Sequence, residues 1–166
     1  LDREPVDAVL FLLERDQVRT GAFFSGMSEE NMFTILAEPY VMIGSDASLR
    51  APTGPLAQDY PHPRAYGSFV RFLRWSFDGK TVPLPEAVRK MTSLPAEHFC
   101  LSGRGVLAKG MKADLVIVNL AGLEERTSFA DPHQLAAGLD TVIVNGVVTL
   151  DRSGLTGRRA GRVLDS

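Results

Sequence analysis

Hydrophobic and polar positions at the start of the chain predict alternating helices and strands. Apolar side chains recur every three or four positions over residues 5–14 and again over residues 28–37, which is the spacing of amphipathic helices. Between them, residues 20–25 are typical of a short buried strand, and residues 40–43 (Tyr-Val-Met-Ile) predict a second one. The order helix, strand, helix, strand indicates an α/β fold, a parallel sheet with crossover helices.

The second predicted strand ends in Gly44-Ser45-Asp46, which places a carboxylate at its carboxyl end. In α/β folds, and above all in (β/α)8 barrels, catalytic side chains lie at that end of the strands. By position alone, Asp46 is either a catalytic carboxylate or a cap of the segment that follows. The next stretch, to about His62, is rich in Pro, Gly, Ala and Ser. Loops of this length commonly form lids or binding surfaces.

The pattern changes near residue 100. Two further helices are predicted over residues 68–76 and 86–92, followed by a final helical turn over residues 93–99. A strand is predicted over residues 113–119 and a hairpin over residues 140–150. Asn145-Gly146 lies at the centre of the hairpin, because these residues suit the two positive φ angles of a type I′ turn. Residues 156–164 are expected to form an extended basic tail. We therefore predict an α/β domain over residues 1–100 and a β domain over residues 101–166.

Composition and charge narrow the classes of function. Of 166 residues, 45% are hydrophobic and 23% are charged, which is ordinary for a globular protein. The net charge of −2 argues against nucleic acid and anionic membranes as partners, and no apolar run is long enough to span a bilayer. Cys100 is the single cysteine, so we expect no internal disulfide, a cytoplasmic location and a small core residue at this position. The chain begins with Leu1, from which we expect a fragment or a processed product.

Histidines give no metal site by spacing. His62, His98 and His133 are too scattered in the sequence to predict zinc binding unaided. His98 and His133 are expected to be structural, whereas His62 lies between two prolines at the end of the long loop and is either a loop-holding residue or a substrate contact.

Several short motifs, taken together, resemble the carboxyl-terminal portion of the amidohydrolase superfamily. The Lys-Ala-Asp-Leu-Val run and the Val-Asn-Gly turn are widespread in that superfamily, whereas His-Pro-Arg-x-Tyr-Gly after Gly-Ser-Asp is more specific to the N-acyl-D-amino-acid deacylase (D-aminoacylase) group. In chain order, the matching motifs are residues 41–46, 62–67, 86–96, 103–105, 110–116, 144–146 and 156–158.

This resemblance implies a fold. Members of the superfamily have a (β/α)8 metal-dependent hydrolase barrel with zinc at its mouth and a small β-sandwich made from both chain ends. Residues 1–100 would then be the last β/α units of the barrel, and residues 101–166 the carboxyl-terminal share of the sandwich. The remaining, N-terminal part of the barrel is an implied partner, and a homo-oligomer is possible.

The resemblance also implies zinc-dependent hydrolysis of the amide bond of N-acyl-D-amino acids. Asp46 would be the catalytic base and a metal ligand, with the other zinc ligands, including a His-x-His pair, outside this chain. Arg64 would bind the substrate carboxylate, because a guanidinium can pair with it in bidentate fashion. His62 and Tyr66 would be further substrate contacts. The chain alone is expected to be inactive.

Two alternatives remain open. One is a cyclic-amide amidohydrolase of the hydantoinase or dihydroorotase kind, which the His-Pro-Arg-x-Tyr-Gly run disfavours. The other is a non-catalytic assembly module that docks on a catalytic partner, which the missing His ligands favour for the chain by itself.

Overall fold

The computed structural model describes residues 2–19, 21–22 and 26–164. The chain divides into two compact units, Leu1–Met32 and Phe33–Ser166, and each is considered by itself. Among the described residues, no helix combines the length and the apolar character needed to cross a bilayer.

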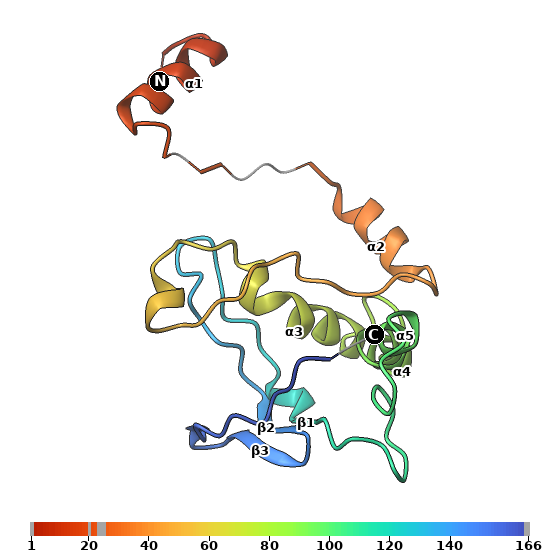
Figure 1. Cartoon of the computed structure of the whole chain (residues 1–166). Helices are drawn as coiled ribbons and strands as arrows, with labels where there is room; N and C mark the ends of the chain where they lie inside the picture. The colour runs from red at the N-terminus through yellow and green to blue at the C-terminus, as the bar shows by residue number, and fades with distance from the viewer. Residues whose placement is uncertain (1, 20, 23–25, 165–166) are drawn as a thin grey trace. The chain divides into compact units, whose positions relative to one another are not determined.

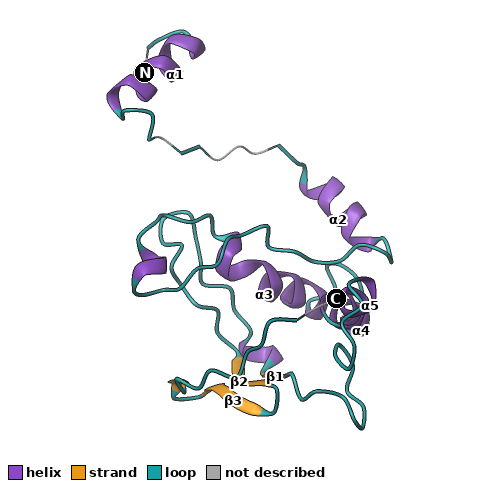
Figure 2. Cartoon of the chain, in the orientation of Figure 1, coloured by secondary structure: helices purple, strands orange, loops and turns teal. Residues whose placement is uncertain are grey.

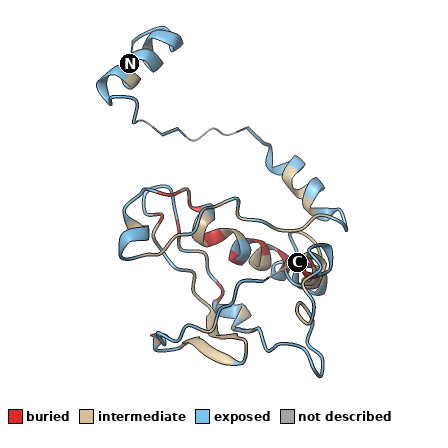
Figure 3. Ribbon diagram, in the orientation of Figure 1, coloured by how far each residue is buried: buried red, intermediate tan, exposed pale blue. Residues whose placement is uncertain are grey.

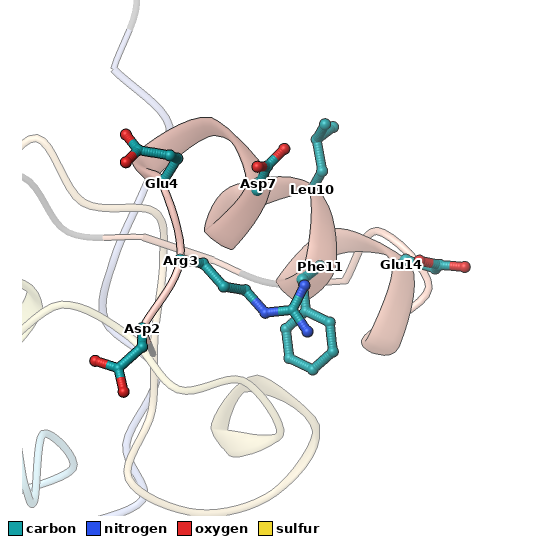
Figure 4. A pocket seen from close by; sticks show the side chains of 7 residues that line it. All are labelled: Asp2, Arg3, Glu4, Asp7, Leu10, Phe11 and Glu14. Carbon is teal, nitrogen blue, oxygen red and sulfur yellow. The ribbon is translucent and has the colours of Figure 1, made fainter.

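The first unit contains helix α1 (Pro5–Arg15), as predicted. Pro5 stands at its first position, where its missing N–H costs nothing. None of its side chains is buried, and Figure 4 shows Arg3 lying over the Phe11 ring, 4.2 Å from the centroid, beside the carboxylates of the helix. The strand predicted over residues 20–25 lies largely outside the described residues, and Gly21 and its neighbour at position 22 are in no strand.

Helix α2 (Glu29–Ala37) also confirms its prediction, including its cap: the Asn31 N–H donates to Ser28 Oγ at 3.1 Å. The strand predicted over residues 40–43 is wrong, because the described residues around it form no strand pairing with it. A strand needs a neighbour to receive its hydrogen bonds. Here the backbone of this segment contacts helix α4 instead, with the Ile43 N–H donating to the Lys90 carbonyl at 3.5 Å.

Three helices carry most of the core of the second unit: α3 (Arg64–Phe77), α4 (Leu84–Met91) and α5 (Ser93–His98). Figure 2 shows them beside long loops, one of which includes the single turn η1 (Pro55–Ala57). In Figure 3 the buried positions gather on α3 and the segments next to it. The buried apolar side chains are Val70, Phe72, Ala87, Ala96 and Leu123.

Helix α3 starts four residues earlier than the predicted residue 68. Pro63 occupies the position before the helix with φ −49°, already helical, and its carbonyl accepts from the Tyr66 and Gly67 N–H groups at 3.1 Å. Proline suits the start of a helix because the first turn needs no N–H donor. Arg64 and Tyr66 therefore lie on the first helical turn and not in the preceding loop.

The β part is a four-stranded antiparallel sheet in the order β1-β2-β3-β4. Figure 1 labels the first three of these strands, β1, β2 and β3. Its strands are β1 (Leu115–Val118), β2 (Leu139–Val144), β3 (Val147–Asp151) and β4 (Gly154–Leu155), with the short turn η2 (Leu120–Gly122) after β1. The predicted hairpin is confirmed: Asn145 and Gly146 have φ of 49° and 81°. Strand β1 forms one edge of the sheet, and its Val116 and Ile117 side chains are more than half exposed.

Cys100 is exposed, which makes its assignment to the core wrong. It follows α5 with φ 55°, and its N–H donates to the Glu97 carbonyl in the turn that leaves the helix. This turn carries the thiol out of the helical core.

Gly67 permits a close approach between α3 and the segment after η2. A Cβ at this position would lie 2.1 Å from Glu125 Oε1 and 2.7 Å from Thr127 Cγ2, well inside van der Waals contact. Glu125 cannot simply swing away, because both of its carboxylate oxygens accept hydrogen bonds from the Arg71 guanidinium.

Gly67→Ala is therefore expected to destabilise the protein. Overpacking costs about 1–3 kcal/mol, which outweighs the gain of about 1 kcal/mol or less from helix propensity. Thermal unfolding measures the difference. Gly161→Ala is the matched control, since nothing lies within 4 Å of its Cβ position; equal unfolding temperatures for the two variants would contradict the close approach.

Candidate active site

The candidate residues come from two segments: residues 38–46 carry Asp46, and residues 62–66 carry His62, Arg64 and Tyr66. The first segment is held by α4. Lys90, fully buried, donates from Nζ to the Glu38 carbonyl and, at 3.0 Å, to the Val41 carbonyl. Arg89 donates to the Pro39 carbonyl. Two cationic side chains of α4 thus hydrogen bond to the backbone of this segment, beside which the described part of the chain forms no strand.

Burial lowers the pKa of the Lys90 ammonium, because the charged form loses its hydration. The neighbouring Arg89 lowers the pKa further, while the Glu86 and Glu38 carboxylates raise it. Arg89 itself is held by a bidentate contact with Glu86, at 2.7 Å for both oxygens. A buried lysine with two carbonyl acceptors is a costly arrangement, which indicates that the position of this segment matters.

Asp46 and Arg64 lie in contact. Arg64 Nη1 is 3.1 Å from Asp46 Oδ2, although they come from the loop after α2 and from the first turn of α3. The Asp46 side chain is 89% exposed, and its backbone has φ 48°, a left-handed conformation uncommon for a residue with a Cβ. An exposed ion pair contributes little to stability. The ion pair therefore adds little to the stability of the fold, and it places the two candidate side chains next to each other.

His62 precedes Arg64 and is fixed by two contacts. Its Nδ1 accepts a hydrogen bond from the Arg64 backbone N–H at 3.0 Å, and its ring meets the Phe129 ring edge-on, 4.9 Å between centroids. Burial lowers the pKa of the imidazole, and the positive charges of Arg64 and Arg71 lower it further. The lowered pKa favours the neutral imidazole, and a neutral ring that accepts through Nδ1 carries its proton on Nε2.

Tyr66 contacts His133, which lies 67 positions further along the chain. Its hydroxyl lies 3.4 Å from His133 Nδ1, and the rings are 6.0 Å apart. His133 Nε2 in turn lies 2.8 Å from the Asp59 carbonyl oxygen. The prediction of a structural role for His133 did not include this contact with a candidate site residue.

His98 shows no such contact. Its ring meets the adjacent Phe99 ring edge-on, with centroids 5.0 Å apart.

The fit of a zinc ion can be tested on the residues present. Among residues 2–19, 21–22 and 26–164, no three His, Cys, Asp or Glu side chains gather in a group that could hold a metal ion. Zinc takes three or four protein ligands. Asp46 supplies a single carboxylate, of which Oδ2 is 3.1 Å from Arg64 Nη1, so the described residues do not make up a zinc site by themselves.

Comparisons with known proteins agree with these motifs. Residues 28–150 match the family described as "Amidohydrolase family". Two curated relatives come from Alcaligenes xylosoxydans xylosoxydans: a D-aminoacylase, 41% identical over 145 residues, and an N-acyl-D-glutamate deacylase, 36% identical over 146 residues. In both cases the match covers 87% of this chain and 28% of the relative. The chain thus spans little more than a quarter of their length.

Solved structures give the same picture. A D-aminoacylase crystal structure, described as defining a novel subset of amidohydrolases, matches with a TM-score of 0.75 and 40% identity. An N-acyl-D-glutamate deacylase from Bordetella bronchiseptica, complexed with zinc and a phosphonate inhibitor that mimics the tetrahedral intermediate, matches with a TM-score of 0.73 and 34% identity. Each match covers 84% of this chain and 28% of the other. The profile of the family extends over well more than half of the sequence, so this chain belongs to the amidohydrolase family.

Proposed function

We propose that this chain is part of a hydrolase that removes the acyl group from N-acyl-D-amino acids. The observation that carries the proposal is the contact between the Asp46 carboxylate and the Arg64 guanidinium, 3.1 Å apart. In an N-acyl amino acid, one carbon atom separates the carboxylate from the scissile amide nitrogen. A proton-transferring group and a carboxylate-binding group for this substrate must therefore lie close together.

Asp46 is the proton carrier in this proposal. Amide hydrolysis needs a base that takes a proton from the attacking water and returns it to the leaving nitrogen. The high exposure of the Asp46 side chain leaves it open to water and substrate. The segment that leads to Asp46 is anchored on α4, through hydrogen bonds from Arg89 to the Pro39 carbonyl and from Lys90 to the Val41 carbonyl.

Arg64 binds the substrate carboxylate in this proposal. A guanidinium has five N–H donors, so one edge can remain on Asp46 while another receives the substrate. The neutral His62 and the Tyr66 hydroxyl, on either side of Arg64 in the sequence, are further candidate contacts.

The complete protein would supply the rest of the site. We propose that residues 1–100 belong to a (β/α)8 barrel and residues 101–166 to a small β-sandwich, with zinc ligands on the part of the barrel that precedes this chain. Bound zinc would polarise the amide carbonyl and acidify water. Asp46 would be one ligand. The cytoplasmic location remains a prediction.

Substrate turnover by the complete protein tests the proposal. We expect hydrolysis of N-acetyl-D-amino acids and no comparable hydrolysis of their L enantiomers or of hydantoin and dihydroorotate. Preferential opening of a cyclic amide would favour the hydantoinase-like alternative. Failure to hydrolyse any amide, with the zinc content measured, would favour an assembly module.

Arg64→Lys in the complete protein tests the carboxylate contact. A lysine ammonium keeps the charge but loses the two-pronged geometry, so KM for an N-acetyl-D-amino acid is expected to rise about tenfold. Steady-state kinetics measure the change. Arg126→Lys, at an exposed arginine that pairs with Glu124 at 3.0 Å, is the control and should leave KM unchanged. An unchanged KM in the Arg64 variant would count against the contact.

A further inference from the structure

The segment of residues 127–133, here called the bracing turn, is closed by its own hydrogen bonds. Thr127 Oγ1 donates to the Pro132 carbonyl at 3.0 Å, and both residues are buried. The Ser128 N–H donates to the Asp131 carbonyl and the Asp131 N–H to Ser128 Oγ, each at 3.0 Å. A short segment closed at both ends and anchored by a buried proline is a rigid support.

This turn lies against residues 59–66, here called the substrate arm. The Phe129 ring meets the His62 ring edge-on, at 4.9 Å between centroids. The Tyr60 hydroxyl lies 2.6 Å from the Phe129 carbonyl oxygen and 2.8 Å from that of Ala130, both of which can only accept. The base of the turn is tied to α3 as well, through the close approach at Gly67.

His133 connects the two ends of the substrate arm. Its Nε2 is 2.8 Å from the Asp59 carbonyl oxygen, an acceptor, so Nε2 carries the proton and donates. In the neutral imidazole Nδ1 is then an acceptor, and the Tyr66 hydroxyl, 3.4 Å away, donates to it. Arg64 lies between these two points in the chain, on the same helical turn as Tyr66.

We propose that the bracing turn sets the geometry of carboxylate binding, with His133 as a positioning residue that acts through Asp59 and Tyr66 on Arg64. This inference rests on the proposed function, since it assigns a role within the same site. The hydrogen-bond partners of His133 are Asp59 and Tyr66, in the substrate arm that carries Arg64, and neither belongs to the segment that carries Asp46, so its effect is expected on substrate binding and not on proton transfer.

The test is a comparison of three variants of the complete protein: His133→Ala, His133→Gln and His98→Ala. Each is assayed with an N-acetyl-D-amino acid and with its α-carboxamide, which lacks the carboxylate. His133→Ala should raise KM for the acid about tenfold, with kcat within about twofold of wild type, and should leave the carboxamide unaffected. His133→Gln should restore KM, because its amide can donate to Asp59 and accept from Tyr66. His98→Ala should resemble wild type.

Other results overturn the inference. An unchanged KM in His133→Ala would do so, as would an equal loss of kcat with both substrates or a failure of His133→Gln to restore KM. If His133→Ala does not fold by circular dichroism, His133→Phe removes both hydrogen bonds and retains a ring beside Tyr66, and an unchanged KM there overturns the inference instead. A wild-type protein inactive on N-acyl-D-amino acids would overturn the proposed function and this role together. An active wild type whose His133 variants keep the wild-type KM would overturn this role alone.

Discussion

Asp46→Asn in the complete protein is expected to lower kcat for N-acyl-D-amino acid hydrolysis by about 10²–10⁴-fold, the contribution usual for a general acid–base group. Asparagine has nearly the shape of aspartate but cannot accept a proton from water or return it to the leaving nitrogen. It can still accept a hydrogen bond from Arg64, which lies 3.1 Å from the carboxylate. KM should therefore change much less than kcat, and steady-state kinetics separate the two.

Asp78→Asn is the matched control for that substitution. Asp78 is also an aspartate paired with an arginine, Arg74, at 2.8 Å, but it lies at the far end of α3 from Arg64. Its variant should keep the wild-type kcat. Near-normal turnover by Asp46→Asn would remove Asp46 from the reaction and leave it a structural partner of Arg64.

Lys90→Met is expected to lower the free energy of unfolding by about 1–3 kcal/mol, since it removes the Lys90 donor of the part-buried Val41 carbonyl and one of the two donors of the Glu38 carbonyl, which also accepts from the Val41 N–H. Removal of the buried charge offsets part of this loss of stability. Burial disfavours the charged ammonium of Lys90, as its lowered pKa indicates. The lost hydrogen bonds outweigh this offset. Denaturant unfolding measures the change, and kcat should also fall because the segment that carries Asp46 loses its support.

Lys109→Met gives the comparison for Lys90→Met. Lys109 is exposed in a turn, so the same exchange there should alter stability by about 0.5 kcal/mol or less. If the two variants unfolded at the same denaturant concentration, Lys90 would not be the support of residues 38–43.

Local chemistry explains which elements were predictable. Helix α1 follows from Pro5 and a regular apolar spacing, α2 from the Ser28 cap, and the β2–β3 hairpin from Asn145-Gly146. Each of these signals acts within a few residues of the element it forms. The family was predictable for a similar reason, because its motifs are short and continuous.

Interactions between distant segments were harder to predict. Residues 40–43 have the composition of a strand, but a strand also requires a partner, and composition cannot supply one. Helix α3 begins before the predicted residue 68, because the fixed φ of Pro63 is already helical and starts the helix there. The contact of Tyr66 with His133 joins residues 67 positions apart, and no sequence spacing encodes that distance.

The role of Lys90 became apparent only from the structure. Ala87 and Lys90 are three residues apart on α4 and share its buried face. A lysine on an apolar face is a costly residue, so its presence there indicates acceptors in the protein interior. What the sequence could not tell was which carbonyls those were.

The exposed edge of strand β1 has a consequence for handling the protein. Val116 and Ile117 stand on a strand whose outer backbone groups have no partner strand among the described residues. Such an edge is a template for intermolecular β-pairing, and apolar side chains along it favour aggregation at high concentration. A lysine in place of Val116 would oppose that association, so the edge is the first position to alter if preparations of this chain precipitate.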